Sequence, residues 1–125
     1  MNFDPKRDEL SKVFRDYQEE ALRFVWKSDG GVTSRETWNH VNEAFEGKKT
    51  ISRASIINFL NGMVDEGVLN YVDRSGKGGY HRVYLPKLDE SCFKKALVES
   101  IISSLVRDFP EETTEVLKQL RSRTP

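Results

Sequence analysis

A helical pattern that runs directly into a glycine-rich hairpin, between residues 51 and 85, constrains the fold more than any other feature of the chain. Ser52 provides an N-cap, and Gly67 provides the left-handed residue that commonly ends a helix. Between them, apolar residues recur at three- and four-residue spacing, which predicts one buried helix face. These residues are Ile56, Phe59, Leu60, Met63 and Val64.

The second half of this stretch predicts an antiparallel hairpin. Leu69–Asp73 and Tyr80–Leu85 are rich in residues that favour strands. The segment Arg74–Gly79 between them is glycine-rich and carries two cations, which is typical of an exposed turn. We therefore expect a helix followed at once by a basic hairpin.

A shorter helix is predicted just before this stretch. Thr33 and Glu36 form a capping box, and Gly47 is expected to end the helix. Its expected buried side chains are Trp38, Val41 and Phe45. Two short helices joined by a tight turn and followed by a hairpin predict a winged helix-turn-helix.

The first 28 residues predict helical structure of uncertain continuity. Asp4 and Pro5 form a favourable helix start, and an apolar stripe then extends to residue 25. The pattern fits one long helix, and it equally fits a shorter helix after a break between Phe14 and Asp16. Asp29 and the glycines that follow it are expected to end this region.

The C-terminal region predicts two further helices separated by Pro110. Apolar residues between positions 93 and 106 cover more of the first helix than burial on one side requires. We therefore expect mainly α structure with a small antiparallel β-hairpin. A winged helix-turn-helix DNA-binding domain would span residues 1–88, and a C-terminal helical dimerisation arm would span residues 89–125. The expected dimerisation residues are Phe93, Leu97, Ile101 and Leu105.

Charge and composition narrow the function. Twenty basic and twenty acidic residues give a net charge of zero, which argues against coating nucleic acid through bulk charge. Residues 47–87 nevertheless carry seven cations against three acids, a balance of +4. The single cysteine, Cys92, excludes an internal disulfide and a cysteine-based zinc site. We expect no cofactor and no enzymatic activity, because no catalytic or metal motif is present.

The residues expected to contact DNA fall into two groups. On the exposed side of the helix after residue 52, candidates for base or backbone contact are Arg53, Ala54, Ser55 and Asn58. Candidates for phosphate contact are Lys48, Lys49, Arg74, Lys77, His81 and Arg82. The alternative interpretation is that both groups are simply solvated surface. No apolar run is long enough to cross a membrane and the N-terminus lacks a signal-peptide pattern, so we expect a cytoplasmic protein.

The chain from Tyr17 to Tyr84 resembles the penicillinase-repressor (BlaI/MecI-type) family of winged-helix transcriptional regulators. The matching pieces are ALRFVWKSDGGVTSRETWNHV, ISRASIINFLNGMVDEGVLNYV and GGYHRVYLP. The resemblance implies a regulator that binds double-stranded DNA, with a repressor acting as a homodimer on a pseudo-palindromic operator as its default form. The chain departs from the family in its longer start, and it lacks the C-terminal cysteine cluster of copper-responsive members. The alternative function is a winged-helix module for protein–protein contact in a larger complex, which the zero net charge favours.

Overall fold

The computed structural model describes residues 2–76 and 78–123 and divides the chain into two compact units. The first unit is Met1–Asp89 and the second is Glu90–Pro125. The boundary expected from the sequence, between residues 88 and 89, lies one residue from this division.

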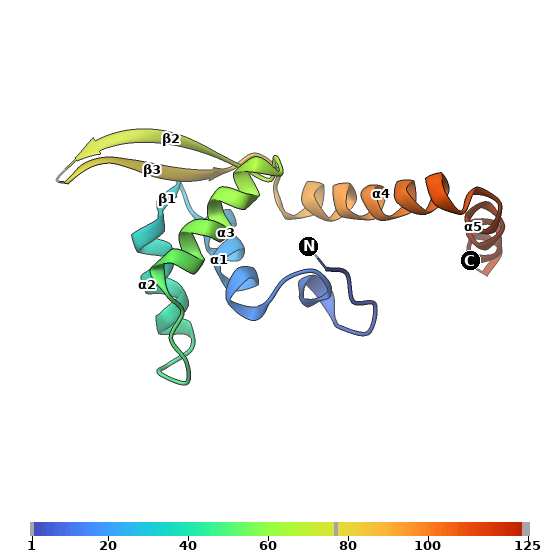
Figure 1. The fold of residues 1–125 in the computed structure, drawn as a ribbon, viewed down its shortest axis with the longest axis horizontal. Helices are drawn as coiled ribbons and strands as arrows, with labels where there is room; N and C mark the ends of the chain where they lie inside the picture. Colours follow the sequence, from blue (N-terminus) through green and yellow to red (C-terminus); the bar gives the residue numbers. More distant parts are fainter. Residues whose placement is uncertain (1, 77, 124–125) are drawn as a thin grey trace. The chain divides into compact units, whose positions relative to one another are not determined.

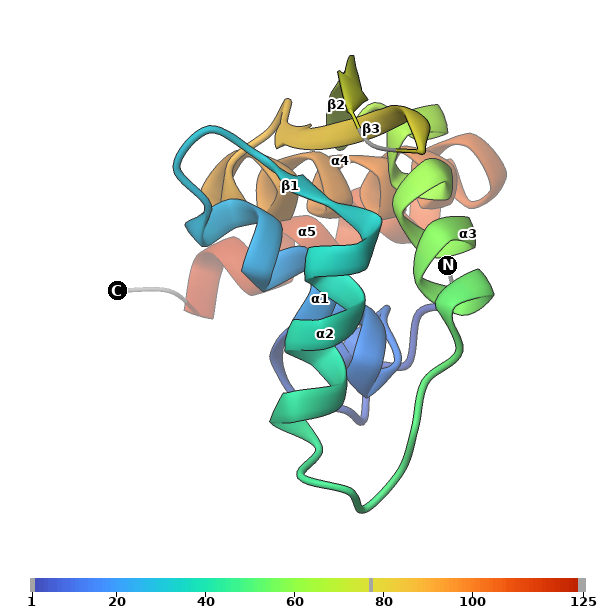
Figure 2. The ribbon, with the colours of Figure 1, turned by 90° about the vertical axis from the view of Figure 1, so that its left-hand side faces the viewer.

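The first unit has the predicted fold class, mainly α with a small antiparallel sheet. Its elements are the 3-10 helix η1 (Glu9–Lys12), α1 (Asp16–Lys27), β1 (Val32–Thr33), α2 (Ser34–Ala44), α3 (Arg53–Asp65), β2 (Leu69–Gly76) and β3 (Gly79–Pro86). The three α-helices lie on one side of the sheet, and the hairpin β2–β3 projects past them (Figures 1 and 2). This order of two helices and a hairpin is the winged helix-turn-helix arrangement.

The sheet has three antiparallel strands in the order β1-β3-β2. In the register, Tyr84 of β3 lies opposite Val32 on one side and Tyr71 on the other. Both hairpin strands are longer than predicted, since β2 reaches Gly76 and β3 begins at Gly79. Strand β1 was not predicted, because a two-residue strand is too short to show a periodic pattern.

The core of this unit is formed by apolar side chains from each helix and from the sheet. Its largest fully buried apolar side chains are Leu22 and Val25 of α1, Val41 of α2, Ile56 and Leu60 of α3, and Leu69 of β2. Burying a side chain of this size stabilises the fold by about 1.5–3 kcal/mol. The predicted apolar face of α3 is therefore confirmed as part of the core.

Three of the predicted helix ends are present, whereas α2 ends at Ala44, three residues before the expected Gly47. Thr33 and Glu36 form a reciprocal capping box on α2, and Ser52 accepts a hydrogen bond from the Ser55 amide at the start of α3. Gly67 has a φ of 80°. The amide of the next residue, Val68, donates to Met63 O at 2.9 Å, which is the long bond of a Schellman motif.

Side chains of α2 fix the turn between α2 and α3. The Asn42 amide donates to Ile51 O at 3.2 Å, and its Oδ1 accepts from Ile51 N at 2.8 Å. Trp38 and Phe45, both expected to be buried, are half-buried. The Trp38 indole N–H donates to the same Ile51 carbonyl oxygen at 2.8 Å. The second tryptophan, Trp26 of α1, donates to Leu88 O at 3.0 Å, after the end of β3.

The prediction of a helix start at Asp4 and Pro5 is wrong. Asp4 Oδ1 accepts from the Lys6 amide at 3.0 Å, and Asp4 O accepts from the Arg7 amide at 3.3 Å, so the segment forms a turn. An aspartate side chain competes in this way with helical backbone bonds. Of the two alternatives left open for residues 1–28, the structure has the shorter helix, which begins at Asp16.

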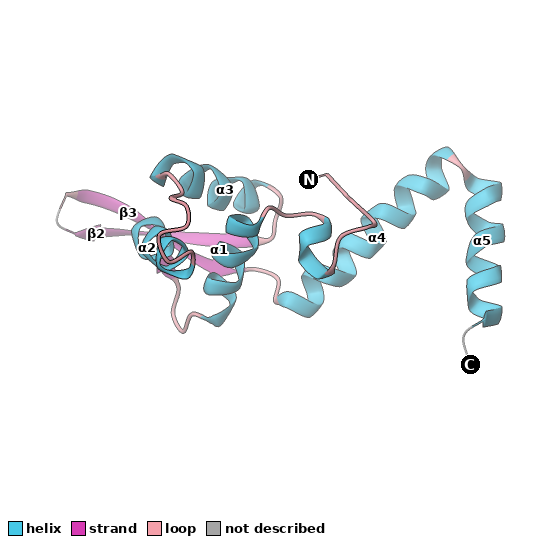
Figure 3. Cartoon of the chain, turned by 90° about the horizontal axis from the view of Figure 1, so that it is seen from below, coloured by secondary structure: helices cyan, strands magenta, loops and turns pink. Residues whose placement is uncertain are grey.

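The second unit consists of α4 (Glu90–Asp108) and α5 (Pro110–Arg123). The two helices change direction at Phe109, where the chain turns a corner (Figure 3). The corner is held by Leu105 O, which accepts from Phe109 N at 2.6 Å and from the Thr113 hydroxyl at 3.1 Å. Within residues 2–76 and 78–123, no helix combines the length and apolar character that crossing a membrane requires.

Candidate nucleic-acid interface

A groove of about 450 Å³ lies between the start of α2, the exposed side of α3 and strand β3. The side chains of basic residues in its lining are Arg35 from α2, Arg53 from α3, and His81 and Arg82 from β3. Among the described residues that line it, none carries a carboxylate. We refer to this site as the arginine groove.

The side of α3 that lines the arginine groove is a regular helical stripe. Arg53, Ile57 and Asn61 are spaced four residues apart and all line the groove. Each residue turns the helix by about 100°, so Ala54 and Asn58 lie close to this stripe. Both are exposed, as expected for residues that contact a partner.

Ser55 does not line the arginine groove, although it lies on the same side of the helix as Asn58, three residues later. It is about 160° from Ile57 around the helix axis, by the same helical geometry. Its hydroxyl is 2.8 Å from the hydroxyl of Ser52, and its amide donates to that hydroxyl at 3.1 Å. Ser55 therefore belongs to the N-cap of α3 and does not line the arginine groove.

Asn61 joins α3 to the sheet on one wall of the groove. Its Oδ1 accepts from the Tyr84 hydroxyl at 2.6 Å and from Arg82 Nη1 at 3.0 Å. The Arg82 guanidinium also lies 3.9 Å from the centroid of the Tyr71 ring, a cation–π contact. Burial raises the pKa of the Tyr84 hydroxyl, so the group remains a proton donor at neutral pH. This junction gives the exposed Arg82 side chain two partners within the chain.

The two lysines of the turn between α2 and α3 do not line the groove. Lys49 forms an ion pair with Asp16 of α1, and its Nζ is 4.6 Å from the centroid of the Phe45 ring. The hydrogen bond from Lys49 lowers the pKa of Asp16. Lys48 is exposed. The structure therefore gives Lys49 an internal partner instead of placing it beside the predicted arginines.

The hairpin brings some of the predicted cations to the groove and not others. Arg74 lies within β2, opposite His81, and not in the turn where the sequence placed it. His81 and Arg82 line the groove, whereas Arg74 does not. Lys77 lies outside the described residues. Tyr80, also in the groove lining, is 82% exposed.

Ten described residues line the groove, and seven of them were not among the predicted DNA contacts: Thr33, Ser34, Arg35, Ile57, Asn61, Tyr80 and Tyr84. Arg35 stands directly after the start of α2, where nothing in the sequence distinguishes it from other surface arginines. Asn61 could have been found, because it lies four residues after Ile57 and eight after Arg53 on one face of the predicted helix. Tyr80 was assigned only to a strand.

The expected dimerisation residues, which all belong to α4, differ in accessibility. Phe93 is only 3% exposed in the single chain, Leu97 and Ile101 are half-buried, and Leu105 is 40% exposed. A hollow of about 370 Å³ forms at the corner of α4 and α5. Its apolar lining comes from Ile102, Leu105, Phe109, Val116, Leu117 and Leu120, and we refer to these six residues as the corner face.

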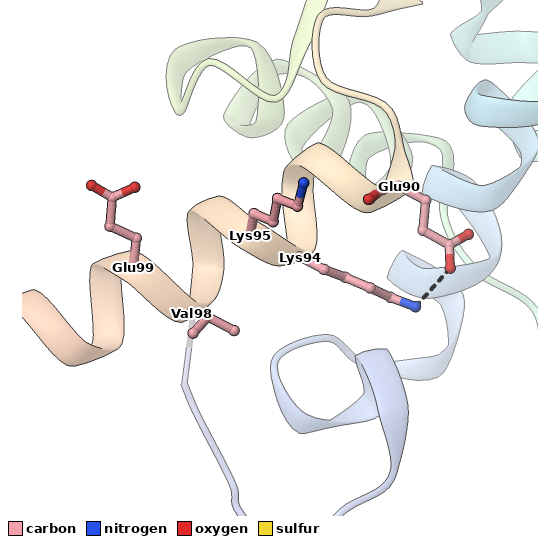
Figure 4. A pocket seen from close by; sticks show the side chains of 6 residues that line it. Glu90, Lys94, Lys95, Val98 and Glu99 are labelled. Carbon is pink, nitrogen blue, oxygen red and sulfur yellow. Dashed lines mark ion pairs between the residues drawn. The ribbon is translucent and has the colours of Figure 1, made fainter. Parts of the chain in front are cut away.

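A larger hollow, of about 690 Å³, lies along the first half of α4. Figure 4 shows that its side chains spread along the helix instead of converging on one point. Lys94 Nζ pairs there with Glu90 Oε2 at 2.8 Å, while Val98 and Glu99 point to different sides. This arrangement offers no convergent set of polar groups that could hold a small ligand.

In comparisons with known proteins, no family model matches the chain and no curated protein is detectably similar to it.

Proposed function

We propose that the protein is a transcriptional regulator that binds double-stranded DNA sequence-specifically as a homodimer, as its resemblance to the penicillinase-repressor family implies. The observation that carries the proposal is the arginine groove, where three arginines and no carboxylate among the described lining residues stand beside an exposed helix face. Cationic side chains supply affinity for DNA phosphates, and an exposed helix fits the major groove. A cationic groove beside an exposed helix face is what a protein that binds double-stranded DNA needs.

In this proposal α3 enters the major groove with the side that bears Ala54 and Asn58. The small side chain of Ala54 allows the helix axis to approach the bases, and the amide of Asn58 suits bidentate contact with adenine. Arg53, Arg82 and the strand residue Arg74 would contact the phosphates on either side. Phosphate contacts position the protein, and base contacts give the sequence preference.

The second unit would form the homodimer. Leu105, Phe109, Leu117 and Leu120 of the corner face are each between 40% and 56% exposed. Contiguous apolar surface of this kind marks an interface or an aggregation liability. A two-fold dimer would bury it and would place two copies of α3 on the half-sites of a pseudo-palindrome. Blocking a promoter is then the default mode of action.

The test is an unbiased selection of bound sequences from random double-stranded DNA at moderate salt. We expect enrichment of an inverted repeat, because each protomer of a two-fold dimer reads one half-site. The matched control is Asn58→Ala. This variant should no longer enrich the half-site sequence, but it should still bind DNA non-specifically. Failure of the wild-type protein to enrich any sequence would refute the proposal.

A second candidate function is a winged-helix module for protein–protein contact. The observation in its favour is the exposed aromatic side chain of Tyr80, which accompanies a net charge of zero. Aromatic residues are enriched at protein interfaces. Loss of partner binding by Tyr80→Ala, together with a failed DNA selection, would favour this function over the first.

A further inference from the structure

The arginine groove has a local charge that the composition of the chain does not predict. Acids and bases are equal in number, and several cations are paired with a carboxylate of the same chain. Examples are Lys49 with Asp16, Arg23 with Glu19 and Lys94 with Glu90. By contrast, Arg35 and Arg53 form no ion pair with any of the residues that the structure describes. Two arginines that converge on one groove without a carboxylate suggest that an anion from outside the chain completes the site.

A third arginine is already held in position. The Arg82 guanidinium is fixed by Asn61 Oδ1 at 3.0 Å and by the Tyr71 ring at 3.9 Å. Because these contacts are made by one N–H group and by one face of the planar group, other N–H groups remain to donate to a ligand. Such preorganisation lowers the entropy that binding costs.

The backbone at the start of α2 is not the principal anion site. Thr33 Oγ1 accepts from the Glu36 amide at 3.1 Å, and Glu36 Oε1 accepts from the Thr33 amide at 2.9 Å. The capping box thus satisfies two amides that a helix terminus would otherwise offer to an anion. An anion in the groove must therefore be held mainly by side chains.

We infer that the arginine groove binds one phosphate of the DNA backbone in each half-site, with Arg35 and Arg53 as its ligands and Arg82 as a third, pre-positioned donor. The inference rests on the proposed function and extends it to a defined contact. Asn58 lies about 60° around the helix axis from Asn61, which lines the groove, so the phosphate in the groove would flank the base pairs that α3 reads. Guanidinium groups suit this role because their planar N–H donors match phosphate oxygens.

The test uses the duplex obtained by selection and replaces its phosphates one at a time with neutral methylphosphonates. For the wild-type protein, one position in each half-site should weaken binding by about 10- to 100-fold, the effect of losing hydrogen bonds to a charged group. Arg35→Ala should weaken binding by a similar factor and lower the salt slope by about 1. In this variant, methylphosphonate at the same position should have little further effect.

The control is Arg7→Ala, which removes the same charge from the N-terminal segment outside the groove. This variant should keep the wild-type profile of methylphosphonate sensitivity. Arg35→Lys should recover only part of the lost affinity, because an ammonium group cannot reproduce bidentate contact.

The outcomes separate the inference from the proposed function. If wild-type protein binds no selected duplex, the proposed function fails and the inference fails with it. If wild-type protein binds but Arg35→Ala keeps its affinity and its methylphosphonate profile, the inference alone is overturned. A third experiment titrates the full chain with ribose 5-phosphate and follows the amide signals of Arg35 and Arg53 by NMR. Saturation below millimolar concentration, with displacement of DNA, would instead identify a free phosphorylated compound as the ligand and overturn the assignment to the backbone.

Discussion

Replacing Asn61 by aspartate should separate the stability of the fold from DNA binding. The carboxylate keeps an acceptor at the position of Oδ1, where Tyr84 and Arg82 now donate at 2.6 and 3.0 Å. Hydrogen bonds to an ionised acceptor are stronger than those between neutral groups, but Arg82 is exposed and solvent screens its charge. Partial desolvation of the carboxylate opposes the gain. We therefore expect the free energy of unfolding to change by no more than about 1 kcal/mol.

The matched variant, Asn61→Ala, should lower the free energy of unfolding. Tyr84 is only 2% exposed, and its hydroxyl would lose the acceptor that it has in the wild-type protein. A buried polar group without a partner costs about 1–3 kcal/mol. The alanine variant should thus unfold at lower denaturant than the aspartate variant, although alanine leaves the charge of the groove unchanged.

For DNA binding, in contrast, Asn61→Asp should be the more damaging of the two substitutions. Aspartate adds a negative charge to a groove proposed to hold a phosphate, and like charges at close range cost several kcal/mol at an interface. We expect Asn61→Asp to weaken binding to selected and scrambled duplexes alike by more than about tenfold, and more at low salt than at high salt. Asn61→Ala should weaken binding less.

The measurements are urea unfolding followed by circular dichroism, and fluorescence anisotropy with labelled duplex over a range of salt. Two results would refute the reasoning. One is an aspartate variant that binds DNA as tightly as wild type at low salt, which would place the phosphate elsewhere. The other is an alanine variant as stable as wild type, which would mean that the Tyr84 hydroxyl does not depend on Asn61.

Four further predictions concern other contacts. Asn58→Ala should cost about 1–3 kcal/mol on the selected duplex and much less on random DNA, measured by competitive anisotropy; equal losses would show that it reads no base. Arg74→Ala combined with Lys77→Ala should weaken binding to all sequences and lower the salt slope by about 1–2, and an unchanged slope would exclude the hairpin as an anchor. Leu105→Glu should give monomers or insoluble protein in sedimentation while the first unit stays folded, and a wild-type monomer at micromolar concentration would contradict the dimer. The pKa of the Tyr84 hydroxyl is raised in the folded protein, so this group adds stability that is fully present below about pH 10 and is lost as the pH rises through the folded pKa. Tyr84→Phe should abolish this loss of stability at alkaline pH when unfolding is measured as a function of pH.

Features fixed by neighbouring residues could be predicted from the sequence. The capping box at Thr33, the N-cap at Ser52 and the left-handed Gly67 each depend on residues within five positions, and all three are present. The buried face of α3 was predictable because helical periodicity repeats within the same short range. The fold class followed from the order of these elements.

Contacts between distant residues could not be predicted in the same way. Asn61 meets Tyr84 across 23 positions, and Lys49 meets Asp16 across 33 positions. The spacing places Asn61 on one helix face with Arg53, but nothing in the local sequence shows that its partner is Tyr84, so the junction beside the arginine groove was missed. The wrong helix start at Asp4 had a local cause, since the same residue type caps helices and closes turns.

The hydrogen bonds of the two tryptophans determine what fluorescence can report about this chain. Trp38 donates to Ile51 O in the turn between α2 and α3, and Trp26 donates to Leu88 O near the end of the first unit. The sequence has only these two tryptophans, so tryptophan emission responds to the first unit and contains no emitter from residues 90–125. Circular dichroism, in contrast, records α4 and α5 together with the other helices. Unfolding curves from the two methods will coincide only if both units unfold in one cooperative step.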